Sequence, residues 1–171
     1  MAASVPDAGG VAFVPALQGL GSPYMDPSAK GALLGLTRAT TRAHVARALL
    51  EGVAFRTREV VEALRADSPT PAFGSLRVDG GMAANDLFLQ AQADVLGIPV
   101  ERPSTNQAPS LGIAYLAGLA VGFWQNVEEI RETRLPVTVF EPGPGAASLE
   151  ERYQAWRHAV EAVRAYAAAT R

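Results

Sequence analysis

Residues 78–85 read Val-Asp-Gly-Gly-Met-Ala-Ala-Asn, and this stretch decides the fold class. Leu76 and Val78 are apolar, which predicts a short strand that enters a tight turn at Asp79-Gly80-Gly81. Apolar residues then recur at helical spacing over residues 84–96, and Gly97 and Pro99 are placed to end a helix. A strand, a glycine turn and a helix in this order indicate an α/β fold.

The segments on both sides extend the pattern. They are expected to be a strand (11–16), a long structured loop (19–35), a long helix (41–66) ended by residues 68–71, a second short strand (100–103), a helix (109–121), a Pro/Gly linker (141–147) and a terminal helix. Ser148 and Glu151 match a capping box at the start of that last helix. Strands this few and short predict an incomplete part of a larger α/β domain whose other strands lie upstream.

The helices carry apolar stripes that predict their buried faces. The predicted stripes are Val45, Leu49, Val53, Thr57, Val60 and Leu64 in the long helix, Leu87, Phe88, Ala91, Val95 and Leu96 after the turn, and Leu149, Tyr153, Trp156, Val160 and Val163 in the terminal helix.

Residues 1–10 are expected to be a disordered tail, residues 11–171 a partial lobe, and residues 127–142 a surface connection.

Composition excludes several classes of function. The 171 residues fit one domain or a piece of one, and a net charge of −2 gives no electrostatic basis for nucleic-acid binding. Without cysteine, disulfides and thiolate-bound metals are excluded, and two histidines far apart make a histidine metal cluster improbable. No apolar run is long enough to span a membrane and no secretory signal is present, so a cytoplasmic protein is the expectation.

The glycine turn is the strongest candidate site. Glycine lets a ligand approach the backbone, and a helix start offers unpaired N–H groups to an anion, so Gly80, Gly81 and Asn85 suit a nucleotide lying over the turn. The alternative is purely structural, because strand-to-helix turns often use glycine and Asn is a common helix cap.

Other polar residues have structural interpretations that we favour. Asp26 and Lys30 could face a substrate, but a rigid surface loop with a solvated ion pair is the interpretation that we favour. The arginines of the long helix favour a solvated helix face over phosphate binding. His44 is expected to be structural, and Glu51 within the apolar part of that helix indicates a buried hydrogen bond.

Three stretches together resemble one family. They are residues 19–27 with Gly35-Leu36-Thr37-Arg38, residues 77–85, and residues 111–124. Their order and spacing are similar to the C-terminal region of glycerol kinases, within the FGGY carbohydrate kinases. The chain departs from that pattern at Met25, Gln107, Pro109 and Ile113, where the family usually has Trp, Glu, Thr and Ala.

The resemblance implies an actin-like, ribonuclease-H-like ATPase lobe and phosphoryl transfer from ATP, as its Mg²⁺ complex, to glycerol. It implies that Gly81 and Asn85 contact the adenine nucleotide, that Gly80 shares the turn and that Asp79 fixes it. The catalytic aspartate, the glycerol contacts and the phosphate hairpin lie upstream in the family, and no stretch here resembles them. No catalytic or metal-binding residue is therefore assigned, and glycerol would be bound by the missing N-terminal lobe.

The same resemblance leaves alternatives open. A relative acting on another polyol or sugar is one, and a non-catalytic nucleotide-binding module is another. Dimers or tetramers are common in the family, so a homo-oligomer is a further expectation, without an assigned interface. The chain alone is expected not to phosphorylate glycerol, because phosphoryl transfer depends on the positioning groups that it lacks.

Overall fold

The computed structural model describes residues 1–67, 74–105, 107–133, 136–144 and 146–170. The predicted end of the long helix at residues 68–71 lies outside them. Five α-helices are described, α1 (Arg42–Asp67), α2 (Asp86–Leu96), α3 (Ala108–Ala120), α4 (Val127–Glu132) and α5 (Ala146–Ala169), together with short 3-10 helices η1 (Ala2–Ser4) and η2 (Gly81–Ala84). The strands are β1 (Ala12–Val14), β2 (Ala32–Leu34), β3 (Leu76–Arg77), β4 (Val100–Pro103) and β5 (Val137–Phe140).

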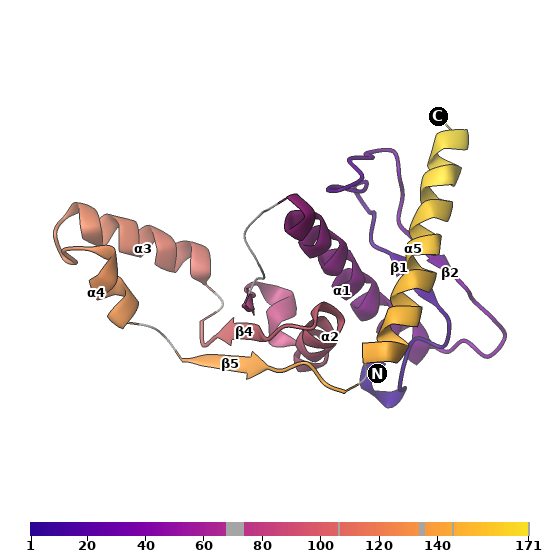
Figure 1. Cartoon of the computed structure of the whole chain (residues 1–171), viewed down its shortest axis with the longest axis horizontal. Coiled ribbons are helices and arrows are strands. Elements are labelled where there is room, and N and C mark those ends of the chain that lie inside the picture. The colour runs from indigo at the N-terminus through magenta and orange to yellow at the C-terminus, as the bar shows by residue number, and fades with distance from the viewer. Residues whose placement is uncertain (68–73, 106, 134–135, 145, 171) are drawn as a thin grey trace.

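The body of the molecule forms where α1, α5 and a small sheet meet (Figure 1). Strands β1 and β2 pair antiparallel, with Phe13 opposite Leu33. Both long helices contact β1, and α2 packs against both α1 and α5. The strand predicted at residues 11–16 is confirmed, whereas β2 lies inside the stretch predicted as a loop.

The second sheet has the order β3-β4-β5 and carries the glycine turn at the end of β3. Strand β4 pairs parallel with β3, placing Val100 opposite Leu76, and antiparallel with β5, placing Val100 opposite Phe140. The parallel pair with α2 between its strands is the predicted strand–turn–helix–strand unit. Strand β5 and helix α4 were not predicted, because residues 127–142 were interpreted as a surface connection.

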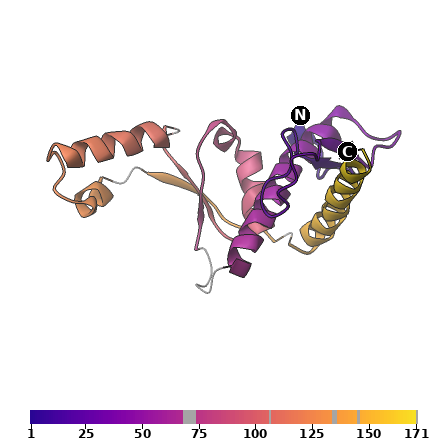
Figure 2. The ribbon, with the colours of Figure 1, turned by 90° about the horizontal axis from the view of Figure 1, so that it is seen from above.

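Helices α3 and α4 extend from the rest of the molecule as an arm, visible in both views (Figures 1 and 2). The α3 helix was predicted, and only Gly118 among its residues is buried. Among the described helices, none is both long enough and apolar enough to cross a bilayer.

The core is centred on α5, whose predicted apolar face is confirmed. Trp156 and Tyr153 are its largest fully buried side chains, and Leu149, Val160 and Val163 are also buried. The predicted face of α2 is also largely right, since Phe88, Ala91, Val95 and Leu96 are buried.

The predicted stripe of α1 is wrong. Leu49 is 39% exposed and Leu64 is 49% exposed, whereas the buried residues are Ala48, Glu51, Gly52, Ala54, Phe55, Glu59 and Val61. The helix turns a face with two glutamates inward because arginines pair with both carboxylates. Apolar periodicity could not reveal a face whose burial depends on ion pairs.

Both ends of the chain differ from the sequence expectation. Residues 1–10 were expected to be a loose tail, but η1 contacts α1, and Ala8 is 4% exposed in a small cluster with Val11 and Ala48. Helix α5 begins at Ala146, so Ser148 lies inside the helix instead of capping it. The capping-box interpretation is therefore wrong.

Candidate functional site

The glycine turn connects β3 to α2 through one exposed 3-10 turn. Gly80 has a φ of +92°, a conformation that side chains other than glycine rarely adopt. The turn is closed by Ala83 N–H, which donates to the Gly80 carbonyl at 3.1 Å, and by Asn85 N–H, which donates to Met82 at 3.1 Å. Gly80, Gly81 and Asn85 are all exposed, so a ligand can reach them from solvent.

The two glycines differ in what the fold requires of them. Gly80 needs to be glycine for its backbone conformation. Gly81 does not have a positive φ, and a Cβ built on it would meet no atom within 4 Å. The fold alone therefore does not require glycine at position 81, and the absence of a side chain there leaves room for a ligand to approach the backbone.

Asn85 is the N-cap of α2, as the structural alternative proposed. Its Oδ1 accepts a hydrogen bond from Phe88 N–H at 3.2 Å, which satisfies one free donor of the first turn. A cap uses only the side-chain oxygen, so the side-chain NH₂ group of Asn85 keeps its capacity to donate to a ligand.

Arg102 on β4 binds the turn through its guanidinium group. The sequence analysis did not identify this residue. Its Nη1 donates to the Ala83 carbonyl at 2.9 Å and to Asp86 Oδ1 at 2.6 Å. Its guanidinium also lies 5.3 Å from the centre of the Phe140 ring. One side chain thus holds η2, the first turn of α2 and β5 in a fixed arrangement.

Asp79 fixes the turn on its other side. Its Oδ2 accepts a hydrogen bond from the Ala108 N–H at 3.0 Å, at the first residue of α3. A carboxylate at a helix N-terminus is favoured because free N–H groups and the helix dipole both attract negative charge. The glycine turn and the start of α3 are therefore linked.

A cavity of about 490 Å³ opens beside the turn. Strands β4 and β5 and the turn after β3 contribute to its wall, which is formed by Val78, Asp79, Gly80, Ala83, Ala84, Arg102, Pro103, Ser104, Thr105 and Thr138. Small ligands occupy sites of this size, in which apolar surface alternates with a few fixed polar groups. Of the predicted site residues, Gly80 lines the cavity itself, and Gly81 and Asn85 follow on the same turn.

The second candidate region, the loop 19–27, is anchored to α1. The Tyr24 hydroxyl donates to Glu59, and Arg56 Nη1 donates to the same carboxylate at 2.8 Å. Burial, together with the hydrogen bond to Glu59, raises the pKa of Tyr24. Asp26 Oδ1 accepts from Ser28 N–H at 3.0 Å, and Lys30 is exposed. Neither Asp26 nor Lys30 lines the cavity at the glycine turn.

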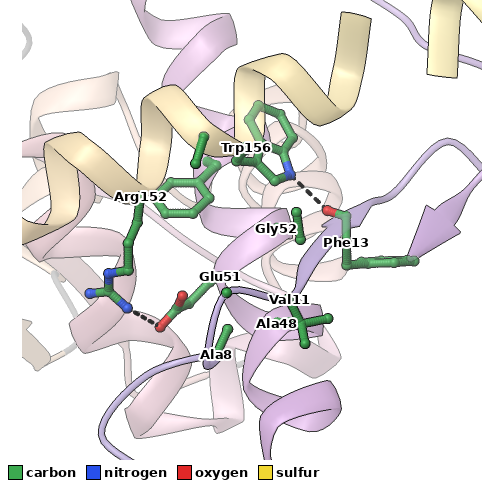
Figure 3. Close-up of a pocket in the computed structure, with 12 residues that line it drawn as sticks. Ala8, Val11, Phe13, Ala48, Glu51, Gly52, Arg152 and Trp156 are labelled. Atoms are coloured by element: carbon green, nitrogen blue, oxygen red, sulfur yellow. Dashed lines mark hydrogen bonds and ion pairs between the residues drawn. The ribbon is translucent and has the colours of Figure 1, made fainter. Parts of the chain in front are cut away.

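Glu51 has the buried hydrogen bonds expected of it. Its Oε1 accepts from Arg47 at 2.7 Å, and its side chain is 4% exposed. The same oxygen accepts from Arg152 of α5 at 2.7 Å (Figure 3). The cavity beside this ion pair measures only about 60 Å³. We interpret this region as a junction between α1, β1 and α5.

The arginines of α1 are less solvated than predicted. Arg47, Arg56 and Arg58 have side-chain exposures of 15%, 15% and 21%, and each forms an ion pair with a glutamate. His44 is structural, as expected, since its Nδ1 accepts from Thr41 N–H at 3.1 Å at the start of the helix.

Comparisons with known proteins identify the family. The model of the C-terminal domain of the FGGY family of carbohydrate kinases matches residues 1–121. Glycerol kinase 2 of Thermotoga maritima is 50% identical over 160 residues, and a glycerol kinase of Gloeobacter violaceus is 52% identical over 161 residues. Each match covers 94% of this chain and 32% of the relative, so the chain spans about a third of their length.

Solved structures give the same result. The structure of Plasmodium falciparum glycerol kinase with ADP matches with a TM-score of 0.83 at 34% identity, over 95% of this chain and 32% of that one. A ligand-bound xylulose kinase from Lactobacillus acidophilus matches with a TM-score of 0.85 at 26% identity, over 99% of this chain and 35% of that one. The expected actin-like lobe is confirmed, and the chain belongs to the FGGY family of carbohydrate kinases, where it corresponds to the C-terminal region of glycerol kinases.

Proposed function

We propose that this chain supplies part of the adenine-nucleotide site of an ATP-dependent glycerol kinase. The complete enzyme would transfer the γ-phosphoryl group of ATP to a terminal hydroxyl of glycerol, giving sn-glycerol 3-phosphate. The observation that carries the proposal is Gly81, a glycine that the fold does not need, on an exposed turn beside a cavity of about 490 Å³. A relative of the same fold, the kinase from Plasmodium falciparum, has a structure with ADP.

The charges around the turn indicate which part of the nucleotide would lie there. Asp86 already occupies the first turn of α2, and Arg102 pairs with it at 2.6 Å. A second negative charge at this helix start would be repelled by the Asp86 carboxylate. The turn therefore suits the purine and ribose, which the Asn85 side chain can contact, and the phosphates would extend toward the rest of the enzyme.

Glycerol is the acceptor that the comparisons favour. The two relatives at 50% and 52% identity are glycerol kinases, whereas the xylulose kinase and a gluconate kinase from Lactobacillus acidophilus are each 26% identical. Mg²⁺ would enter with the phosphates of ATP. The described residues contain no group of three or more His, Asp or Glu side chains arranged to hold a metal ion. The Mg²⁺ ligands would therefore be the nucleotide and residues outside this chain.

The first prediction tests the site. Gly81→Ala should raise the dissociation constant for ADP at least about tenfold, because the new methyl group occupies space that the ligand needs. The free energy of unfolding should change by less than about 0.5 kcal/mol, because the Cβ meets no atom of the chain. Binding would be measured by titrating the ¹⁵N-labelled chain with ADP and following the amide shifts of residues 79–85.

Gly21→Ala is the matched control. Gly21 also lacks a positive φ and has open space around its Cβ position, but it lies in the loop 19–27. This variant should bind ADP like the unsubstituted chain. ADP-induced shifts that avoid residues 79–85, or equal affinity in the Gly81 and Gly21 variants, would show that the nucleotide binds elsewhere.

The second prediction concerns activity. The purified chain should show no glycerol-dependent ATP turnover in a coupled assay, because it lacks the groups that position the acceptor hydroxyl. The complete Thermotoga maritima enzyme serves as the positive control. Turnover by the unsubstituted chain that the Gly81→Ala substitution abolishes would contradict the prediction. Turnover at the same rate in the unsubstituted chain and in the Gly81→Ala variant would identify a contaminating kinase.

A further inference from the structure

The 3-10 turn η2 depends for its shape on contacts from outside it. One hydrogen bond of 3.1 Å runs from Ala83 N–H to the Gly80 carbonyl, and a second of the same length runs from Asn85 N–H to the carbonyl of Met82. Hydrogen bonds of 3-10 geometry are poorer than those of an α-helix, so a single such turn is not rigid by itself. The backbone of Gly81 and the side chain of Asn85, which are expected at the nucleotide, are therefore only as well fixed as the rest of the turn.

The carbonyl group of Ala83 is the buried point of this turn. Ala83 is 5% exposed, and the described residues provide no backbone N–H for its carbonyl oxygen. Its donor is Arg102 Nη1, at 2.9 Å. Leaving a buried carbonyl without a donor is unfavourable, so the turn would have to rearrange and expose this oxygen to water if the guanidinium were removed.

The same nitrogen also pairs with Asp86 Oδ1 at 2.6 Å, but this second contact is more exposed to solvent. The side chain of Asp86 is 73% exposed, against 26% for that of Arg102. Ion pairs that water can reach contribute little to stability, because solvent screens the two charges. This difference assigns the control of the turn to the hydrogen bond with the Ala83 carbonyl and not to the ion pair.

We propose that Arg102 is a positioning residue for nucleotide binding. Its guanidinium fixes the Ala83 carbonyl, and through this carbonyl it holds the turn in the shape that presents Gly81 and Asn85 to the ligand. The guanidinium is itself held in place, because it lies 5.3 Å from the centre of the Phe140 ring on the neighbouring strand. This inference rests on the proposed nucleotide site and adds to it a residue of β4 that acts through the turn.

The test is Arg102→Met in the ¹⁵N-labelled chain, because methionine keeps an apolar stem beside Phe140 but carries no donor. Without ligand, the amide hydrogens of Ala83 and Asn85 should exchange with solvent at least about tenfold faster, since they close the turn. The dissociation constant for ADP should rise at least about fivefold. Exchange in the core of α5 should stay unchanged, which separates loosening of the turn from general unfolding. If this variant loses its cooperative unfolding transition, Arg102→Gln, whose amide is too short to reach the carbonyl, should give the same two results.

Two control variants separate the hydrogen bond from the charges. Arg77→Met removes the same charge from the same sheet, at a side chain that is 64% exposed and pairs with Glu101 at 3.0 Å. Asp86→Asn removes the charge that pairs with Arg102 but leaves the donor to the Ala83 carbonyl in place. Both controls should keep the amide exchange of the turn and should bind ADP within about twofold of the unsubstituted chain.

Each other outcome has one reading. Unchanged amide exchange at Ala83 and Asn85 in Arg102→Met would overturn the proposal, as would faster exchange with unchanged affinity for ADP. A loss of affinity in Asp86→Asn as large as that in Arg102→Met would assign the effect to the ion pair and would also overturn it. These results leave the proposed function intact when ADP still shifts the amides of residues 79–85 in the unsubstituted chain. ADP-induced shifts elsewhere in the unsubstituted chain would overturn both.

Discussion

Replacing Gly52 with alanine is expected to lower the free energy of unfolding by about 1–3 kcal/mol, although alanine is the better helix former by roughly 1 kcal/mol. A Cβ at position 52 would lie 2.3 Å from the carbonyl oxygen of Phe13 and 3.2 Å from its carbonyl carbon. Both are backbone atoms of β1 and cannot rotate away. The strand would have to move off α1, which would disturb the buried contacts around it.

Gly112→Ala provides the matched control for this prediction. Gly112 is also in a helix, α3, and a Cβ there would meet no atom within 4 Å. It should leave the free energy of unfolding unchanged or raise it by up to about 1 kcal/mol. Urea unfolding followed by far-UV circular dichroism would measure both. Equal stability of the two variants would show that the approach of β1 to α1 is looser than described.

Replacing Trp156 with alanine should cost about 3–5 kcal/mol of unfolding free energy, a large fraction of the roughly 5–15 kcal/mol that is typical of a domain. Trp156 is 2% exposed, and its ring centre lies 5.8 Å from that of Phe55. Its Nε1–H donates to the Phe13 carbonyl at 2.7 Å (Figure 3). The substitution removes a large buried ring and the donor of this hydrogen bond together.

Two further variants separate these contributions. Trp156→Phe keeps most of the ring but leaves the Phe13 carbonyl without its donor, so it should cost about 1–3 kcal/mol. Trp124→Ala changes the other tryptophan, which is half-buried beside α3 and outside the main core, and should cost less than Trp156→Ala. Chemical unfolding of the three variants measures their losses of unfolding free energy. A larger loss for Trp124→Ala than for Trp156→Ala would show that Trp156 is not at the centre of the main core.

Much of the fold could be predicted because local signals and burial agree. The face of α5 follows from apolar residues at helical spacing, and each predicted member from Leu149 to Val163 is buried. The end of α2 follows from Gly97, which has a φ of +65° and caps the helix as predicted. At such positions the local sequence pattern and the position of the residue in the folded chain require the same type of residue.

The remaining elements depend on contacts distant in sequence. Strand β5 pairs Val100 with Phe140, but residues 127–142 were interpreted as a surface connection, so the strand pattern Val-Thr-Val-Phe at 137–140 was missed. The buried face of α1 includes Glu51, which is stabilised there by Arg152 more than a hundred residues later. Glutamate in an apolar stretch indicated a buried hydrogen bond but could not name its partner.

The candidate site was predictable to the same degree. The glycine turn follows from a short stretch and the role of Asp79 from the family resemblance, but neither reveals the start of α3 as the partner of Asp79. Arg102 was missed because its contacts, Ala83 and Asp86, lie on other elements. The alternation along β4 offers a weak signal, since Arg102 falls two residues after the buried Val100.

The hydrogen bond from Trp156 to Phe13 has a consequence for biosynthesis. While the ribosome is still extending the polypeptide toward position 156, the inner side of β1 and its neighbour α1 lack the indole that later covers them. The residues matched by the family model, 1–121, would emerge without α5. This part of the nascent chain would remain open to proteases and chaperones until α5 has been synthesised.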